Sequence, residues 1–210
     1  MSRLAARRYV GACLLLGAGI PALSLLAADP QPAGTSEPAS PVVPEYQGTD
    51  LKLPRDYRRW VFVGSNLGLR YGKNLRHTTP RESDRVRDDE VGSFHNVYIN
   101  PEAYAEYLAS GTFPVPTILV MEVYEAHQRD AGSVLTHGHF PGALERVEVA
   151  VKNDHRPDGS KTEWAYYDFG LASKPAAAFE DAVCYKCHQQ HASDDNVWVQ
   201  FYPILRDKKP

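Results

Sequence analysis

The stretch Cys184-Tyr185-Lys186-Cys187-His188 decides how the rest of the chain is organised. Two cysteines separated by two residues and followed directly by histidine form the attachment motif of a c-type haem. On one turn of helix, both thiols face the same edge of a porphyrin and can form thioethers with its vinyl groups. The imidazole of the next residue then lies over the ring and can bind iron as the proximal ligand. The stretch therefore predicts one covalent haem c, with His188 as the metal ligand.

Two other interpretations of these cysteines compete with the haem. A redox dithiol of the thioredoxin kind lies in a βαβ pattern, and none surrounds Cys184 and Cys187. A zinc site would combine them with His188 or His191, but zinc prefers four ligands in tetrahedral array. The only other cysteine, Cys13, lies in a segment that we expect to be removed.

Residues 1–28 have the pattern of a secretory signal. The start carries three arginines, residues 10–26 are almost wholly apolar or small, and two alanines at 27–28 offer a cleavage site. An uncleaved membrane anchor at residues 9–28 is the alternative, although the run is short for a span of about 20 residues. We therefore expect a periplasmic or otherwise exported protein.

Residues 29–45 predict a flexible linker, because five of the 16 prolines fall there among small polar residues. We expect the haem domain over residues 46–210. Removal of the first 28 residues would reduce the 23 basic residues to 20 and leave all 26 acidic residues in place. This acidic balance argues against nucleic acid as a partner, since phosphate binding requires a basic surface.

The hydrophobic pattern predicts an α+β fold, mainly antiparallel β-sheet with short helices, and with the haem held on a C-terminal helix. Residues 117–125 form the clearest strand, with Met121 on one face and Glu122 on the other. Residues 144–152 alternate in the same way, which makes Lys152 an outward charge. Asn100 is expected to cap a helix that begins at Pro101.

The remaining predicted elements are assigned from shorter patterns. They are a helix at 53–60, strands at 60–67, 94–99, 162–169 and 196–202, loops at 71–90 and 132–142, and a turn at 153–159.

Several motifs resemble, in order, those of the cytochrome P-460 family, which includes the cytochromes c′-β. The resemblance covers about residues 46–206. Its motifs are residues 53–64, 97–104, 111–113, 149–152, 164–167, 184–188 and 201–206.

The resemblance implies a largely antiparallel β structure, often dimeric, with one c-type haem and histidine as its sole axial protein ligand. Some members of the family oxidise hydroxylamine and carry a lysine bonded covalently to the haem. Others lack this bond, bind nitric oxide or similar small ligands, and have a distal pocket lined by phenylalanine.

The chain departs from the hydroxylamine-oxidising members at two positions. Met121 aligns with the cross-linking lysine, and a thioether cannot form the amine bond. His95 falls where those members have arginine. Both departures favour the ligand-binding branch of the family.

The candidate pocket residues each have a simpler interpretation as core or surface. Met121 is a core residue, a wall of the haem pocket or an axial ligand. Phe62, Phe94 and Phe113 are candidates for the distal pocket, although ordinary core positions are the simpler interpretation of each. His95 and Glu122 are the candidate proton-handling residues for catalysis.

These features together predict an exported monohaem cytochrome that binds nitric oxide or a similar small nitrogen oxide at an open iron face. A hydroxylamine-type oxidoreductase and a His/Met electron-transfer cytochrome are the alternatives. The expected partners are a small gaseous ligand, a redox partner protein and a second copy of the chain.

Overall fold

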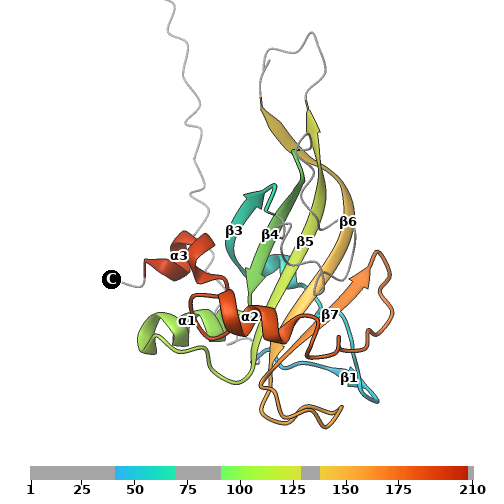
Figure 1. Cartoon of the computed structure of the whole chain (residues 1–210), viewed down its shortest axis with the longest axis vertical. Helices are drawn as coiled ribbons and strands as arrows, with labels where there is room; N and C mark the ends of the chain where they lie inside the picture. The colour runs from blue at the N-terminus through green and yellow to red at the C-terminus, as the bar shows by residue number, and fades with distance from the viewer. Residues whose placement is uncertain (1–40, 70–90, 129–137, 208–210) are drawn as a thin grey trace, which may run out of the picture. The chain divides into compact units, whose positions relative to one another are not determined.

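The computed structural model describes residues 41–69, 91–128 and 138–207. Its centre is an antiparallel sheet of five strands: β3 (Val61–Leu67), β4 (Ser93–Ile99), β5 (Thr117–Gln128), β6 (His139–Lys152) and β7 (Trp164–Gly170). Each strand pairs with the next in the chain, so the order across the sheet is β3-β4-β5-β6-β7 (Figure 1). A separate ribbon pairs β1 (Tyr46–Gln47) with β2 (Asp50–Leu51).

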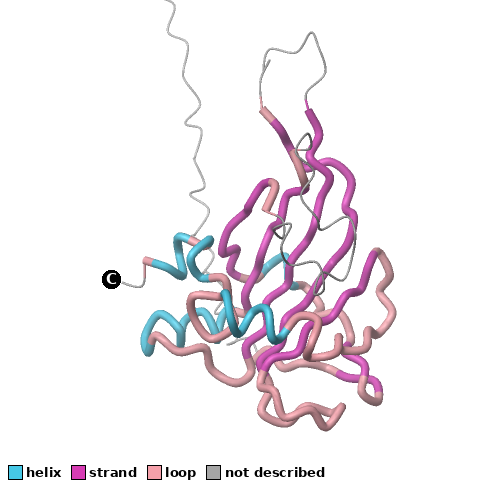
Figure 2. Tube along the Cα trace, in the orientation of Figure 1, coloured by secondary structure: helices cyan, strands magenta, loops and turns pink. Residues whose placement is uncertain are grey.

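The described helices are short (Figure 2). They are η1 (Tyr57–Arg59), α1 (Pro101–Ser110), α2 (Tyr185–His191), η3 (Val199–Phe201) and α3 (Pro203–Arg206). α1, α2 and α3 gather beside one end of the sheet (Figure 1). The mainly antiparallel α+β fold predicted from the sequence is confirmed.

The strand register assigns alternate residues to two faces of the sheet. One row across β4 to β7 consists of Ile99, Leu119, Ala150 and Tyr166, which are paired in turn. This row packs in one hydrophobic cluster with side chains of α1, α3 and the segment after α2. We call this surface the helix-side face.

The other surface, the opposite face, carries a second hydrophobic cluster. The strands contribute Val120, Val149 and Val151, and the chain before the sheet contributes Leu51 and Tyr57. The centre of the sheet is therefore buried on both faces, and each fully buried large apolar side chain contributes about 1.5–3 kcal/mol.

α1 begins at Pro101 and is closed by Gly111, whose φ of 76° is the left-handed value that glycine adopts at a helix end. Asn100 occupies the predicted N-cap position, but its side chain makes no capping bond to the helix. Its Oδ1 instead accepts the backbone N–H of Ile118 at 2.8 Å. The side chain thus ties the start of α1 to β5, which corrects its predicted capping role.

The strands predicted at 60–67, 94–99, 117–125, 144–152 and 162–169 are confirmed. The helix predicted at 53–60 is reduced to the single 3-10 turn of η1. The loop predicted at 132–142 is wrong at its end, because β6 begins at His139, and residues 132–137 lie outside the described residues. The predicted loop at 71–90 and the predicted signal at 1–28 also lie outside them.

The strand predicted at 196–202 is wrong. Apart from one bridge between Asp194 and Val197, this segment forms η3 and leads into α3. Short apolar runs cannot be assigned by period alone. Here Val199 and Tyr202 are buried by 3-10 and helical turns, without pairing to the sheet.

The prediction that Lys152 points outward is also wrong, because the residue is only 8% exposed. Alternation separates the two faces of a strand, but it does not show whether a face meets solvent or protein. In this sheet the helix-side face is covered as well, so Lys152 lies under other segments.

Candidate functional site

The motif cysteines lie at the start of α2. Cys184 is the residue before the first helical turn, and Cys187 is buried within the helix. Burial raises the pKa of the Cys187 thiol, whereas a redox-active dithiol depends on a thiolate stabilised by a lowered pKa. The redox dithiol therefore fits these surroundings poorly.

The imidazole of His188 is held by one neighbour on each ring nitrogen. Its Nδ1 lies 2.8 Å from the carbonyl oxygen of Asn196, and its Nε2 lies 3.2 Å from the indole Nε1 of Trp198. A carbonyl oxygen can only accept and an indole N–H can only donate. The proton is therefore on Nδ1, and the lone pair is on Nε2.

Aromatic rings enclose the same imidazole. The ring of Tyr166 lies 4.4 Å from that of His188 between centroids, and the ring of Trp198 lies at 5.3 Å. Burial lowers the pKa of His188 to about 4, so the ring is neutral at physiological pH. Neutral imidazole, with a lone pair on one ring nitrogen, is the form that binds metal ions.

The carbonyl that orients His188 belongs to a tight turn at residues 194–197. The backbone N–H of Val197 donates to the Asp194 carbonyl at 2.7 Å, and both central residues, Asp195 and Asn196, have positive φ, of 40° and 61°. Aspartate and asparagine tolerate this left-handed region better than most residues. The turn thus holds a fixed carbonyl beside the imidazole.

Side chains from three elements anchor this turn. Tyr107 of α1 donates to Asp194 Oδ2 at 2.8 Å, and Trp164 of β7 donates to Asp195 Oδ1 at 3.1 Å. Lys152 of β6 donates to Asp195 Oδ2 at 2.8 Å. The sequence signalled a turn through the Asp-Asp-Asn run, but nothing in it indicated that Lys152 would anchor the turn.

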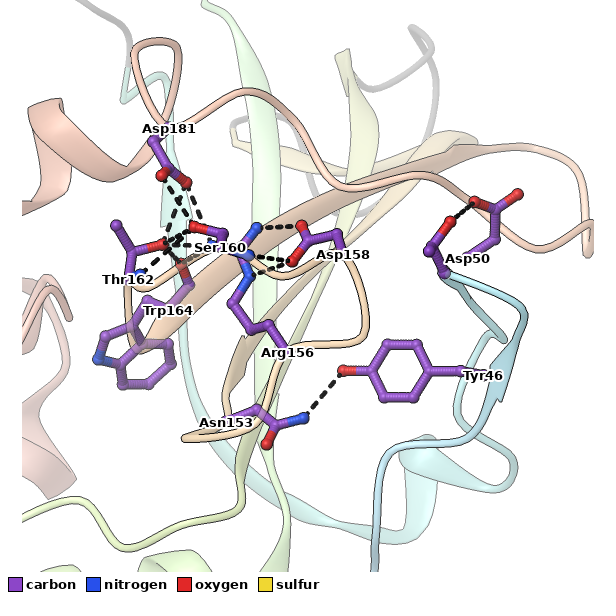
Figure 3. A network of polar contacts seen from close by, with 10 residues as sticks. Tyr46, Asp50, Asn153, Arg156, Asp158, Ser160, Thr162, Trp164 and Asp181 are labelled. Atoms are coloured by element: carbon purple, nitrogen blue, oxygen red, sulfur yellow. Dashed lines mark hydrogen bonds and ion pairs between the residues drawn. The ribbon is translucent and has the colours of Figure 1, made fainter.

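A second polar network lies before α2 and is built around Arg156, whose side chain is 2% exposed (Figure 3). Its guanidinium contacts Asp158 Oδ2 at 2.5 Å and Asp181 Oδ1 at 3.1 Å, and it also donates to Thr162. Ser160 donates to Asp181 Oδ2 at 3.0 Å. The network fastens the segment that enters α2 to the loop between β6 and β7.

Met121 lies on the helix-side face and packs against the same hydrophobic cluster as Cys184 and Trp198. It is paired with Val97 on one side and with Glu148 on the other. This position is consistent with the predicted pocket wall and does not distinguish it from an axial ligand.

Two further polar residues share the helix-side face with Met121. His95 pairs with Val123, and Asn66 of the edge strand pairs with His95. The Nδ2 of Asn66 is buried, and none of the described residues gives it a hydrogen-bond partner. A buried donor without a partner costs about 1–3 kcal/mol and calls for a functional explanation. Sequence reasoning missed Asn66, because asparagine in a strand carries no signal of its own.

Phe62 and Phe94 lie on the opposite face. Phe62 pairs with Tyr98 and is 48% exposed, and Phe94 pairs with Tyr124. By register, therefore, neither phenylalanine lies on the helix-side face, where the ring of Tyr166 contacts His188. Strand parity decides this outcome, since neighbouring residues in a strand point to opposite faces.

Phe113 lies on the helix side but is packed into the core. Its ring stacks on Tyr107 with centroids 3.9 Å apart and meets the edge of Trp164 at 6.2 Å. Its exposed fraction is 1%. These contacts suit the simpler interpretation of Phe113 as a core residue.

Glu122, the other candidate proton-handling residue, lies on the opposite face and is 1% exposed. Its Oε1 accepts from Tyr57 Oη at 2.7 Å and from Arg58 Nε at 2.6 Å. Its Oε2 accepts from Tyr124 Oη at 3.0 Å and from Tyr98 Oη at 3.4 Å. A carboxylate with four donors is a structural centre, and it faces away from His188.

The donor set fits a haem c. Two cysteines and a neutral imidazole come from one short helix and the residue before it, and the Asn196 hydrogen bond selects Nε2 as the nitrogen that could bind a metal. Iron at Nε2 would replace the Trp198 hydrogen bond. Within the described residues, no group of three or more His, Cys, Asp or Glu side chains is placed to hold a metal ion, so the zinc interpretation gains no support.

None of the helices in the described part of the chain combines the length and the apolar character that a membrane crossing requires. The proposed anchor at residues 9–28 lies outside the described residues.

The comparisons with known proteins give one family. The family model described as Cytochrome P460 matches residues 54–199, which include β3 to β7, α1 and α2. No curated protein matched the chain.

Proposed function

The chain belongs to the cytochrome P460 family, and from this premise we propose that it is an exported monohaem protein that binds nitric oxide or a similar small nitrogen oxide. The family implies a haem c cofactor and action on nitrogen compounds. The finer proposal is that one haem is bound covalently and that its iron keeps an open face.

One observation carries this proposal: the two neighbours of His188 leave its lone pair on Nε2. In the proposed site, Cys184 and Cys187 would hold the cofactor as thioethers and Nε2 of His188 would bind its iron. When bound, the haem iron supplies a coordination position for a small nitrogen ligand.

The helix-side face supports ligand binding over turnover. By the sequence resemblance, Met121 stands where the hydroxylamine-oxidising members carry lysine, and it packs apolar surface against the helix-side cluster. Asn66 offers a buried N–H that can donate to a bound ligand. Glu122 is excluded as a proton donor at this face because its four partners hold it on the other side of the sheet.

Two other functions each have one observation in their favour. His95 shares the helix-side face with Met121, so a hydroxylamine-type oxidoreductase retains one residue suited to proton transfer. Met121 packs against the cluster that also receives Trp198, so a His/Met electron-transfer site is the second alternative. In that case a methionine-to-iron absorption band would disappear in Met121→Ala.

Export, assembly and partners complete the proposal. The basic and apolar pattern of residues 1–28 supports a periplasmic location. A homodimer is proposed because the family resemblance implies it, and a redox partner protein is proposed because the iron must be reduced before it binds nitric oxide tightly. The molar mass in solution, measured by light scattering, tests the dimer.

Optical spectra of the reduced protein, recorded with and without nitric oxide, test the proposed function. An open iron face predicts a five-coordinate ferrous spectrum that changes on addition of nitric oxide. A six-coordinate low-spin spectrum that nitric oxide leaves unchanged would contradict it. Turnover of hydroxylamine with an artificial electron acceptor would favour the enzyme alternative.

A further inference from the structure

Lys152 is a buried cation, and one of its contacts leads to the turn beside His188. Its Nζ donates to the Phe113 carbonyl at 2.9 Å and to Asp195 Oδ2 at 2.8 Å, while Glu163 lies farther away at 3.7 Å. The Lys152 side chain is 10% exposed and that of Asp195 is 26% exposed. Water screens this partly buried ion pair less than it screens an exposed one, so the attraction between Lys152 and Asp195 is stronger than in a typical surface ion pair.

Asp195, which Lys152 anchors, directly precedes Asn196, whose carbonyl accepts the hydrogen bond from His188. Asp195 and Asn196 are the two central residues of the turn at residues 194–197, and both have positive φ. Non-glycine residues in this region are strained and persist only where surrounding contacts hold them. Lys152 and Trp164 supply those contacts on the Asp195 carboxylate.

The turn passes this restraint on to the imidazole. The Asn196 carbonyl accepts the Nδ1–H of His188 at 2.8 Å and also a hydroxyl bond from Tyr166 at 3.4 Å. A stronger hydrogen bond at Nδ1 makes an imidazole a more basic metal ligand. Any change that moves the carbonyl will therefore change the donor strength of Nε2.

We propose that Lys152 and Asp195 are positioning residues that set the strength of His188 as an iron ligand, acting through the Asn196 carbonyl. This inference rests on the proposed haem site and deepens it. Lys152 lies on the helix-side face of the sheet, whereas Glu122 lies on the opposite face. Through His188, the Lys152–Asp195 pair would tune the preference of the iron between its ferric and ferrous states.

The sign of the effect separates positioning from simple charge. If only charge matters, Lys152→Met lowers the reduction potential, because a nearby cation favours the ferrous state. If positioning dominates, the weakened Nδ1 bond makes His188 a poorer donor and raises the potential. Asp195→Asn raises the potential in both cases, so Lys152→Met is the deciding variant.

The experiment measures reduction potentials of the haem-loaded wild type, Lys152→Met, Asp195→Asn and Lys152→Arg. Positioning predicts a higher potential in Lys152→Met, equivalent to roughly a tenfold rise in the ferrous-to-ferric ratio, or about 59 mV for one electron. Lys152→Arg keeps the cation and should return the potential toward the wild-type value. A lower or unchanged potential in Lys152→Met overturns the proposal.

A second readout follows the hydrogen bond itself by NMR of ¹⁵N-labelled histidine in the diamagnetic ferrous carbon monoxide complex. The Nδ1–H proton of His188 should move upfield in Lys152→Met and Asp195→Asn, and it should stay in place in the matched control Asp181→Asn. Asp181 also pairs with a buried cation, Arg156, but it lies before α2. An unchanged signal in both test variants overturns the proposal.

The same NMR readout separates the two hypotheses. If the wild type carries no haem, the proposed function fails, and the Nδ1–H signal of the haem-free protein still reports whether the pair positions His188. If the wild type carries haem and the signal ignores Lys152, only the positioning role fails.

Discussion

Replacing Glu122 by glutamine tests whether this residue is structural or catalytic. The carboxylate is 1% exposed and accepts four hydrogen bonds on the face of the sheet away from His188. Glutamine keeps the shape but turns one acceptor oxygen into an NH₂ donor, which then faces hydroxyl and guanidinium donors. The variant should therefore lose stability and keep its ligand chemistry.

The size of the loss follows from the partners. A hydrogen bond to a charged acceptor contributes about 1.5–3 kcal/mol. The Arg58 side chain is 61% exposed, so its ion pair adds less than about 1 kcal/mol. The buried Tyr57 bond and the weaker Tyr124 bond carry most of the effect, and relief of the buried charge offsets part of it. We expect Glu122→Gln to lower the free energy of unfolding by about 3 kcal/mol.

Urea unfolding of the haem-loaded protein measures this loss, and nitric oxide binding to the ferrous form measures the function. Glu125→Gln is the matched control, because Glu125 lies on the same strand with a half-exposed side chain. Its free energy of unfolding should change by no more than about 0.5 kcal/mol. If Glu122→Gln unfolds like the wild type but loses ligand binding or turnover, the structural interpretation is refuted.

Three further predictions concern other parts of the molecule. Asn66→Val should leave the free energy of unfolding unchanged or raise it by about 1–3 kcal/mol, because it removes a buried donor that no described residue pairs. Nitric oxide should dissociate faster from this variant in stopped-flow traces. Slower dissociation would contradict the proposed role of Asn66 as a donor to the ligand. Burial and, to a smaller extent, the hydrogen bond to Glu122 raise the pKa of Tyr57 above its ordinary value of about 10. The unfolded chain therefore releases this proton at a lower pH than the folded chain, and the free energy of unfolding should fall as the pH rises above about 10. A free energy of unfolding that stays constant at alkaline pH in urea titrations would count against this prediction. Met121→Leu should keep the ferrous spectrum of the wild type, and a change from six to five coordination would show instead that Met121 is a ligand.

The features that the sequence predicts well are local ones. The spacing of Cys184, Cys187 and His188 is a property of one helical turn, and the alternation in β5 belongs to a single strand. Such patterns need no knowledge of distant partners, which explains why the α+β fold and the family were both predicted.

The features that escaped prediction depend on contacts between distant segments. The sequence pattern predicts that Lys152 is a surface charge, whereas in the structure its side chain contacts Asp195 in the turn at residues 194–197. Phe62 and Phe94 could be placed on a face only once the register was known, and a bulge between Phe62 and Gly64 shifts the parity along β3. Glu122 receives its donors from residues 57, 58, 98 and 124, which no local pattern connects.

The central claim is that a porphyrin is bonded covalently to Cys184 and Cys187. The most direct test is the intact mass of the denatured protein, purified from cells that mature c-type cytochromes, beside that of a Cys184→Ser, Cys187→Ser double variant. The account predicts that the wild type retains one haem mass after denaturation and that the double variant retains none. A wild-type mass equal to that of the bare polypeptide, with two thiols free to react with an alkylating reagent, would contradict it.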